Sequence, residues 1–247
     1  MSDIQQDYED FISTVSHELR TPLTSIRGFS QTMLSSWDKL DDSSKKKFIK
    51  IIEEQSNRLI HLVENMLAVT KLKSGGTIVY NETDIRPIVE QTVAIVKNQY
   101  PNQTFEININ PNTEKIFVDK DKFQQIMTNL VENSAKYSVS PYITRINVFS
   151  IANYVEIKVS NIGIGIEKED YEKIFTKFSR IDNPLTRKVQ GSGLGLYITK
   201  NLVEKMGGSV SVESIPLRDN SGMSEITFIL KMPVKTIEEQ ARIKCNR

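Results

Sequence analysis

The chain has 247 residues, 38% of them hydrophobic and 26% charged, which is typical of a globular protein long enough for two domains. Its 32 basic and 31 acidic residues leave a net charge of +1, so charge gives no reason to expect a nucleic-acid or bulk membrane partner. The single cysteine, Cys245, excludes an internal disulfide and favours a reducing compartment. No apolar run approaches the roughly 20 residues that a membrane span requires, and the polar start does not resemble a signal peptide. We therefore expect a cytoplasmic protein, or the cytoplasmic portion of a longer one that contacts a membrane only through an upstream region.

The first predicted element is a long amphipathic helix, because apolar residues recur at intervals of three and four. Its apolar positions are Tyr8, Phe11, Ile12, Val15, Leu19, Ile26, Phe29 and Met33. His17 lies inside this helix beside Glu18, and Pro22 follows. A proline removes one helical donor and crowds the carbonyl group four residues earlier, which here belongs to Glu18. We therefore expect the helix to bend or loosen beside His17.

The second predicted element is another helix, which Asp42, Ser43 or Ser44 is expected to cap. Its apolar positions repeat by four and three, as in a coiled-coil seam: Phe48, Ile52, Gln55, Leu59, Leu62, Met66 and Val69. A further set widens the apolar face beyond one seam: Ile49, Ile51, Ile60, Val63 and Leu67. Two helices alone cannot cover this surface. We therefore expect an antiparallel hairpin that forms a four-helix bundle in a homodimer.

A short Ser-Gly-Gly segment at residues 74–76 is expected to be a hinge. It separates a helical domain of residues 1–73 from a second domain of residues 77–235, which a polar tail of residues 236–247 follows. The second domain interleaves strand and helix patterns, which predicts an α/β sandwich with helices on one face of a mixed sheet. Its predicted strands are residues 77–82, 104–109, 115–118, 144–150, 154–160, 209–214 and 225–231. Its predicted helices are residues 84–100, 121–137 and 194–206, the first capped by Asp84 and the last ended by Gly207 and Gly208.

Four polar or amphipathic residues share one face of the helix predicted at residues 121–137. They are Asn129, Asn133, Lys136 and Tyr137. Two asparagine carbonyl groups and one ammonium group suit a complex of Mg²⁺ with phosphate, since the hard cation takes oxygen ligands and lysine takes phosphate charge. A solvated helix face is the alternative interpretation of the same pattern.

Two glycine runs occur about 30 residues apart, at residues 161–166 (Asn-Ile-Gly-Ile-Gly-Ile) and 191–196 (Gly-Ser-Gly-Leu-Gly-Leu). Gly163, Gly165, Gly191, Gly193 and Gly195 permit close backbone approach. The second run leads directly into a helix whose N-terminal amides can bind phosphate. Either run alone would be explained as a turn, and neither has the Rossmann or P-loop spacing. Together they favour a nucleotide pocket with a lid at residues 175–190, where Arg180, Arg187 and Lys188 supply positive charge.

His17 has three possible roles on the residues alone. It lacks nearby partners for a metal site, because the other histidine, His61, lies alone on the second helix. It can be a core histidine that packs inside the helical domain. It can also be a nucleophile, with the adjacent Glu18 carboxylate orienting the imidazole or accepting its proton. For His61 we expect no role beyond the bundle or its surface.

The motifs together resemble those of two-component sensor histidine kinases. Residues 17–22 (His-Glu-Leu-Arg-Thr-Pro) resemble the H box, and residues 129–137 (Asn-Leu-Val-Glu-Asn-Ser-Ala-Lys-Tyr) resemble the N box. Residues 174–178 (Ile-Phe-Thr-Lys-Phe) resemble the F box, and residues 191–196 the second glycine box. The resemblance covers nearly the whole chain with every box in family order, which makes it far more specific than any single box.

The resemblance implies a dimerisation and phosphotransfer hairpin followed by a Bergerat-type ATP-binding domain. In such kinases the γ-phosphoryl group of ATP passes to the histidine, here His17, and then to an aspartate of a response regulator. It implies Glu18 as the acid/base partner of His17, Thr21 as the residue that positions water for a phosphatase reaction, and Asn133 as the Mg²⁺ ligand. The nucleotide residues implied are Asn129, Asn133, Lys136, Tyr137, Asn161, Gly163, Gly165, Arg180, Gln190, Gly191, Ser192, Gly193, Leu194 and Gly195.

One position departs from the family pattern. The first glycine box usually begins with an aspartate that accepts a hydrogen bond from the adenine amino group, and this chain has Asn161 there. A neutral acceptor makes a bond about half as strong as a charged one, a loss on the order of 1–2 kcal/mol and about tenfold in affinity. A degenerate kinase that mainly docks or dephosphorylates a regulator is therefore an alternative function. An ATPase of the gyrase or Hsp90 type is a third, although it needs no histidine-bearing hairpin.

Overall fold

The structure is a computed structural model of the chain, and it describes residues 2–73, 77–179, 181, 191–218 and 222–234. Within residues 2–11 and 72–73 it describes the backbone alone. The chain forms two compact units, Met1–Lys71 and Leu72–Arg247. The predicted hinge at residues 74–76 and the predicted tail at residues 236–247 lie outside the described residues.

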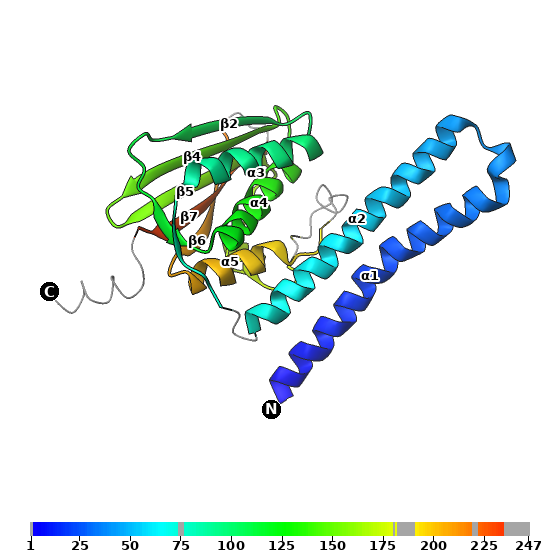
Figure 1. Cartoon of the computed structure of the whole chain (residues 1–247), viewed down its shortest axis with the longest axis horizontal. Coiled ribbons are helices and arrows are strands. Elements are labelled where there is room, and N and C mark those ends of the chain that lie inside the picture. The colour runs from blue at the N-terminus through cyan, green and yellow to red at the C-terminus, as the bar shows by residue number, and fades with distance from the viewer. Residues whose placement is uncertain (1, 74–76, 180, 182–190, 219–221, 235–247) are drawn as a thin grey trace. The chain divides into compact units, whose positions relative to one another are not determined.

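The first unit is a hairpin of two long antiparallel helices (Figure 1). Helix α1 spans Ser2–Ser36, a 3₁₀ turn η1 spans Trp37–Lys39, and helix α2 spans Asp42–Lys73. The predicted hairpin is thus confirmed. Pro22 lies inside α1 without interrupting it, and its ring is buried.

The two helices pack along the predicted seam. Every seam position of α2 is buried or half-buried, with Leu62 and Val69 the most enclosed. Across the pair the rings of Phe29 and Phe48 lie 5.2 Å apart between centroids. The 3.5-residue repeat therefore identified the inner face of α2.

A second apolar stripe stays exposed on the hairpin, and we call it the open apolar face. Its members keep between 43% and 84% of their surface in contact with solvent: Ile12, Leu23, Leu34, Trp37, Ile49, Ile60, Val63 and Leu67. Four of these are residues that the sequence placed outside the seam, and Ile51, the fifth of that set, is half-buried. A single hairpin therefore buries one of its two apolar faces.

The start of α2 differs from the prediction by one residue. The cap is Asp41, whose Oδ1 accepts a hydrogen bond from the Ser44 amide at 2.6 Å. Hydrogen bonds from the Ser44 backbone and side chain lower the pKa of Asp41 below its usual value. Asp42 instead lies in the first turn, where its carboxylate pairs with Lys45 at 3.7 Å. Residues 41–44 (Asp-Asp-Ser-Ser) are all of types that cap helices. The sequence alone therefore could not decide which of the four is the cap.

The second unit is the predicted α/β sandwich. Its five-stranded sheet has the order β2-β4-β5-β7-β6, in which β2 and β4 are parallel and the other neighbours antiparallel. The strands are β2 (Thr104–Ile109), β4 (Ile143–Ile151), β5 (Tyr154–Gly163), β6 (Ser209–Pro216) and β7 (Ser224–Pro233). One face carries the helices α3 (Ile85–Gln99), α4 (Lys120–Lys136) and α5 (Gly195–Lys205) (Figure 1). Strands β1 (Asn81–Thr83) and β3 (Ile116–Val118) form a separate two-stranded sheet.

The core of this unit lies between the helix layer and the sheet. Helix α4 contributes Phe123, Ile126, Met127 and Leu130, all fully buried. Strand β5 contributes Val155, Ile157 and Val159, also fully buried and spaced by two as one face of a strand requires. Asn161 continues this row at the C-terminal end of β5, with 3% of its surface exposed. A carboxamide thus occupies the end of an otherwise apolar row.

The first predicted strand is shorter than expected, because β1 begins at Asn81 instead of residue 77. The preceding backbone is held by side chains: the Val79 amide donates to Asp119 Oδ2 at 3.1 Å. Asp119 also caps α4 through the Lys122 amide. The Tyr80 hydroxyl donates to the Lys205 carbonyl oxygen at the end of α5 at 2.9 Å. An alternating pattern does not distinguish such a side-chain-anchored segment from a strand.

The predicted cap of α3 and the predicted glycine end of α5 are confirmed, whereas α4 and α5 each begin one residue away from the predicted start. Asp84 caps α3 by accepting from the Arg86 amide, and Gly207 has a φ of +75° just after α5. Between β5 and α5 the chain forms two short 3₁₀ turns, Lys168–Asp170 and Lys173–Phe175. In the part of the chain that the structure describes, no helix combines the length and apolarity needed to cross a bilayer.

Candidate active site

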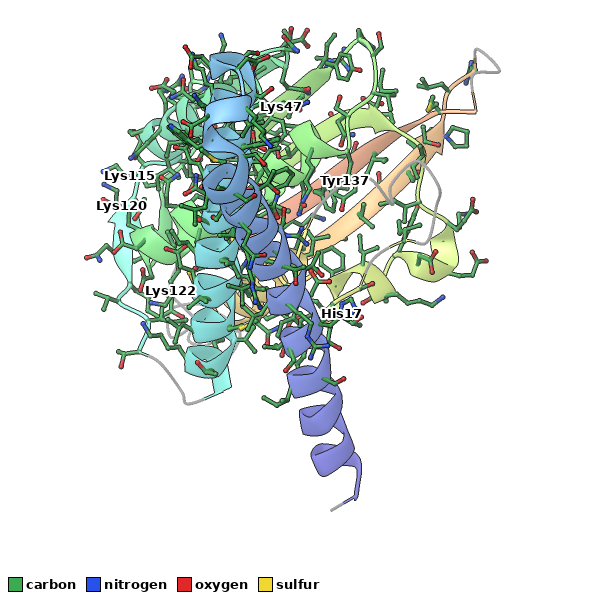
Figure 2. All side chains as sticks on the ribbon, turned by 90° about the vertical axis from the view of Figure 1, so that its right-hand side faces the viewer. His17, Lys47, Lys115, Lys120, Lys122 and Tyr137 are labelled. Carbon is green, nitrogen blue, oxygen red and sulfur yellow. The ribbon has the colours of Figure 1, made fainter. Side chains whose placement is uncertain are left out.

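The candidate acceptor is on α1 of the hairpin. The imidazole of His17 is exposed, and Figure 2 shows it projecting from the helix. Thr21 lies one turn further along, also exposed, with its hydroxyl donating to the His17 carbonyl oxygen at 3.4 Å. An exposed histidine on a regular helix has the access that a nucleophile needs and is not a core residue. Within the single hairpin, His17 is therefore not a core histidine.

Glu18 is half-buried and its carboxylate is directed toward the other helix. Arg58 Nη2 on α2 donates to Glu18 Oε2 at 3.2 Å, and each side chain keeps 22% of its surface exposed. Arg58 was not among the residues that the motifs predicted. Its partner is 40 residues away in sequence, so no local pattern signals the pair.

His61 lies on α2 with its ring exposed. Its Nδ1 is 3.4 Å from Glu64 one turn away. Both side chains are about two-thirds exposed. His61 therefore belongs to the helix surface, as the sequence predicted.

In the second unit, the predicted polar face of α4 is present. Asn129, Asn133 and Lys136 are half-buried, and Tyr137 is the C-cap residue of α4. Tyr137, which follows the last residue of α4, is labelled in Figure 2. The face is enclosed by neighbouring elements instead of being fully solvated, which disfavours the solvated-face alternative.

Asn129 joins α4 to the first turn of α5. Its Nδ2 donates to the Gly195 carbonyl oxygen at 3.2 Å and lies 3.4 Å from Thr199 Oγ1. The side-chain nitrogen of Asn129 thus donates its hydrogen bonds within the protein. The side-chain oxygen, Oδ1, can only accept. Asn129 therefore fixes the second glycine run to the N-box helix.

The second glycine run lies against Lys136. A methyl group added at Gly191 would be 2.7 Å from Lys136 Nζ, so the ammonium group is next to the glycine backbone. The run then enters α5, whose N-cap residue Leu194 makes no side-chain cap bond. The Ser192 hydroxyl accepts from the Leu194 amide at 3.3 Å. An ammonium group and a helix N-terminus thus converge on one segment, an arrangement that suits phosphate.

Gly193 is required by a close backbone contact. Its φ is +66°, and an added Cβ would be 2.7 Å from the Cα and carbonyl carbon of Phe178. Phe178 itself has a φ of +59°. The end of the F-box segment and the second glycine run are therefore in direct backbone contact, while Ile174 and Phe175 anchor that segment by burial.

The first glycine run is connected to the end of α4. An added Cβ at Gly163 would be 2.9 Å from the Tyr137 carbonyl oxygen. The Val139 amide donates to the Ile162 carbonyl oxygen at 2.9 Å. Asn161, one residue earlier, donates from Nδ2 to the same carbonyl oxygen at 3.3 Å. The structure thus gathers the end of β5, the end of α4 and the start of α5 into one half-site.

Further along the run, Gly165 has a φ of +83°, and an added Cβ would lie 2.8 Å from Ser224 Oγ. The next residue, Ile166, donates its amide to Ser214 Oγ at 3.0 Å. These contacts tie the loop that leaves β5 to strands β6 and β7.

Two further groups near this half-site were not predicted. The Ser134 hydroxyl is fully buried and has no hydrogen-bond partner, alone among the buried side-chain polar atoms of the described residues. Burial, and then the charge of Glu132 and the Tyr137 phenol, raise the pKa of Tyr100 to about 12. The helical period does place Ser134 on the core face of α4, and that was the available signal.

Several predicted residues cannot be placed. Arg180, Gln190, Arg187 and Lys188 lie outside the described residues. His17, Glu18 and Thr21 belong to the hairpin unit, whereas the other predicted site residues belong to the α/β unit. Each group of candidate residues is therefore described within its own unit.

Two family models match the chain. Residues 7–75 match the His Kinase A (phospho-acceptor) domain. Residues 118–235 match the histidine kinase-, DNA gyrase B- and HSP90-like ATPase. The chain belongs to the two-component sensor histidine kinases. The ATPase match implies that this kinase family member binds ATP.

Curated histidine kinases are similar over most of the chain. The sensor histidine kinase WalK of Bacillus subtilis (strain 168) is 32% identical over 242 residues, covering 96% of this chain and 38% of WalK. The histidine-protein kinase ArlS of Staphylococcus haemolyticus (strain JCSC1435) is 30% identical, covering 83% of this chain and 45% of ArlS. The chain thus spans less than half the length of these relatives.

Solved structures of histidine kinases share the fold. ThkA in complex with the response regulator protein TrrA matches with a TM-score of 0.71 and 23% identity, covering 95% of this chain and 64% of that one. The Acinetobacter baumannii kinase AdeS matches with a TM-score of 0.65 and 21% identity, covering 89% and 98%. The hairpin and α/β sandwich are therefore arranged along the sequence as in known histidine kinases.

Proposed function

We propose that this chain uses ATP to phosphorylate His17 and then passes the phosphoryl group to an aspartate of a response regulator. The observation that carries the proposal is that one chain contains both an exposed histidine on the hairpin and, in the α/β unit, an arrangement suited to phosphate. In that arrangement Lys136 lies against Gly191, and Asn129 fixes the first turn of α5. We place this activity in the cytoplasm, consistent with the composition of the chain.

The α/β residues have separate tasks in this mechanism. Lys136 and the N-terminal amides of α5 hold the phosphate tail. Asn161 holds the base from the end of β5, and the backbone at Gly163 and Gly165 permits the base to approach closely. The carboxamide oxygens of Asn133 and Asn129 suit Mg²⁺, which prefers oxygen ligands. When bound, this ion would neutralise charge on the β- and γ-phosphates.

The hairpin residues carry the transfer itself. One ring nitrogen of His17 attacks the γ-phosphorus, and the bond from that phosphorus to the bridging oxygen breaks to release ADP. Glu18 accepts the proton from the other ring nitrogen, which keeps the attacking nitrogen nucleophilic. The phosphoryl group on the imidazole is then transferred to a carboxylate of the regulator, and the imidazole regains a proton.

We further propose that the hairpin pairs with a second copy of the chain. The open apolar face runs along several turns of both α1 and α2. A four-helix bundle is the assembly that buries such faces. His17 lies about 130° around α1 from that face, at roughly 100° per residue, so it stays accessible in the dimer.

The regulator can also be a substrate for dephosphorylation. Thr21 is exposed one turn from His17, with its hydroxyl held by the His17 carbonyl group. We propose that this hydroxyl positions water toward the phosphoaspartate of a docked regulator. Finding that Thr21→Ala dephosphorylates the regulator at the wild-type rate would refute this second activity, while Thr21→Ser is expected to retain it.

A docking function with weak ATP use remains the second candidate, and buried Asn161 is the observation that favours it. The test incubates the chain with γ-³²P-ATP and Mg²⁺ and looks for acid-labile, base-stable label. We expect label in the wild type and none in His17→Gln, with His61→Gln as the matched control that stays labelled. A wild type without label would favour the docking function. Label that persists in His17→Gln would move the acceptor elsewhere.

A further inference from the structure

The Glu18–Arg58 pair connects the two helices beside the phosphoacceptor. It joins residues 40 apart in sequence at 3.2 Å, and both side chains are mostly shielded from solvent. Surface ion pairs often contribute little, but a pair held between two packed helices restrains the direction of both side chains. This one therefore decides where the Glu18 carboxylate points.

In this conformation Oε2 of the carboxylate is held on the side of α1 that faces α2. Consecutive helical residues diverge by about 100°, and Glu18 lies toward α2 whereas His17 lies toward solvent. Arg58 holds Glu18 on the α2 side. To accept a proton from the His17 ring, the carboxylate must leave Arg58 and turn about α1. The observed pair and the proton transfer therefore compete for the same carboxylate.

The backbone at the same position is weakened. Pro22 has no amide hydrogen, so it cannot bond the Glu18 carbonyl group as a helical residue would. The α1 helix nonetheless continues through this turn. The residue with the weakened backbone is thus the residue whose side chain is fixed to α2. Loss of the ion pair and bending of this turn would both free the Glu18 side chain to move.

We propose that Arg58 is a positioning residue that withholds Glu18 from His17, and that releasing this ion pair makes the carboxylate available for autophosphorylation. The inference rests on the proposed function and deepens it, because it names a control element within the acceptor helix pair. Arg58 takes no part in the chemistry. It acts by setting the population of hairpins in which Glu18 can reach the imidazole.

The test compares Arg58→Gln with the wild-type chain. We expect the rate of His17 phosphorylation at saturating ATP to rise about fivefold, which equals about 1 kcal/mol, with an unchanged KM for ATP. Arg58→Lys keeps the charge without the planar fork, so its rate should lie between the two. The gain must disappear when Glu18→Gln is combined with Arg58→Gln, because no carboxylate then remains to be released.

The matched control is Lys50→Gln, which removes an exposed ion pair with Glu54 on the same helix and should leave the rate unchanged. A second readout needs no ATP: the NMR signals of the His17 ring should shift in Arg58→Gln and not in Lys50→Gln. An unchanged or lower rate, a gain that persists without Glu18, or an unshifted ring would each overturn the proposal. If the wild type is not labelled at all, the proposed function fails, and the ring signals still decide the role of Arg58.

Discussion

The two units of this chain treat their apolar residues differently. In the α/β unit the helix layer covers the sheet, and the largest core side chains, such as Phe123 and Leu130, are fully buried. In the hairpin one seam is buried while the open apolar face remains in solvent. The α/β unit thus completes its core within one chain, whereas the hairpin leaves an apolar face that the proposed dimer would bury. In the proposed dimer, the unit that carries His17 would depend on pairing to complete its core, and the α/β unit would not.

The largest expected effect comes from a charge placed on the open apolar face. Val63→Asp would bury an unpaired carboxylate in the proposed four-helix bundle, which costs several kcal/mol. We expect the dimer to weaken by about a thousandfold, roughly 4 kcal/mol, as measured by analytical ultracentrifugation.

The control for this comparison is Ile107→Asp. Ile107 has similar exposure, 40% against 45% for Val63, but lies on the edge strand β2 of the α/β unit. It should leave the dimer intact. A monomeric wild type, or a Val63→Asp variant that still dimerises, would contradict the contrast between the two units.

A smaller effect is expected at Asn161, the proposed base-binding residue of the α/β unit. Asn161→Asp replaces a neutral acceptor with a charged one in a buried position, so it should tighten adenine binding by about tenfold, or about 1.4 kcal/mol. Titration of ATP against the His17→Gln chain measures binding without turnover. If the wild type already binds at micromolar ATP and Asn161→Asp brings no gain, the carboxamide is not a weak point of the site.

The stability that Asp119 provides by holding the Val79 segment should depend on pH. Burial raises the pKa of Asp119, but hydrogen bonds from the Lys122 side chain and from the Val79 and Lys122 amides outweigh burial and lower it below 3.8. A pKa lowered on folding stabilises the protein above the unfolded value, and this stability is lost as the pH falls through the folded value. Asp119→Asn should therefore cost about 1 kcal/mol at pH 7.

Urea unfolding of the two proteins at several pH values measures this difference. The curves of the wild type and Asp119→Asn should converge as the pH falls below 3.8, since the wild-type carboxyl group is then protonated. Curves that stay parallel well below pH 3.8 would show that the charge of Asp119 does not hold the Val79 segment.

The smallest expected effect has the opposite sign. The Ser134 hydroxyl is buried without a partner, so Ser134→Ala should raise the unfolding free energy by up to about 1 kcal/mol. The matched control is Thr92→Val, which removes an equally buried hydroxyl that accepts from Gln124 Nε2 at 2.7 Å. That control should destabilise the unit. Destabilisation by Ser134→Ala would indicate that the hydroxyl has a partner in solution.

Local sequence patterns predicted most of the fold. The helical repeat located the seam of α2, and turn chemistry located the Asp84 cap and the end of α5 at Gly207. The same patterns failed where neighbouring residues have equal propensity, as at the Asp41 cap, or where a side chain replaces a strand partner, as at Val79.

The candidate site shows the same division. Spacing placed Asn129, Asn133 and Lys136 on one face of a helix, because the period of a helix is fixed. The contacts of Arg58 with Glu18 and of Asp119 with Val79 each join residues 40 positions apart. Such contacts depend on how elements pack, and a single sequence carries no local signal for them.

Two glycines of this chain would behave in opposite ways in a library of all single substitutions. At Gly193 the left-handed backbone and the Phe178 main chain at 2.7 Å leave no room for any side chain. Selection for kinase function should therefore recover only glycine at this position. At Gly28, within α1, an added Cβ would meet no atom within 4 Å beyond the adjacent residues and the nearby backbone of its own helix, so many residues should survive and alanine should even be enriched. The tolerance of one position and the intolerance of the other would map, without any further structure, which backbone segments touch.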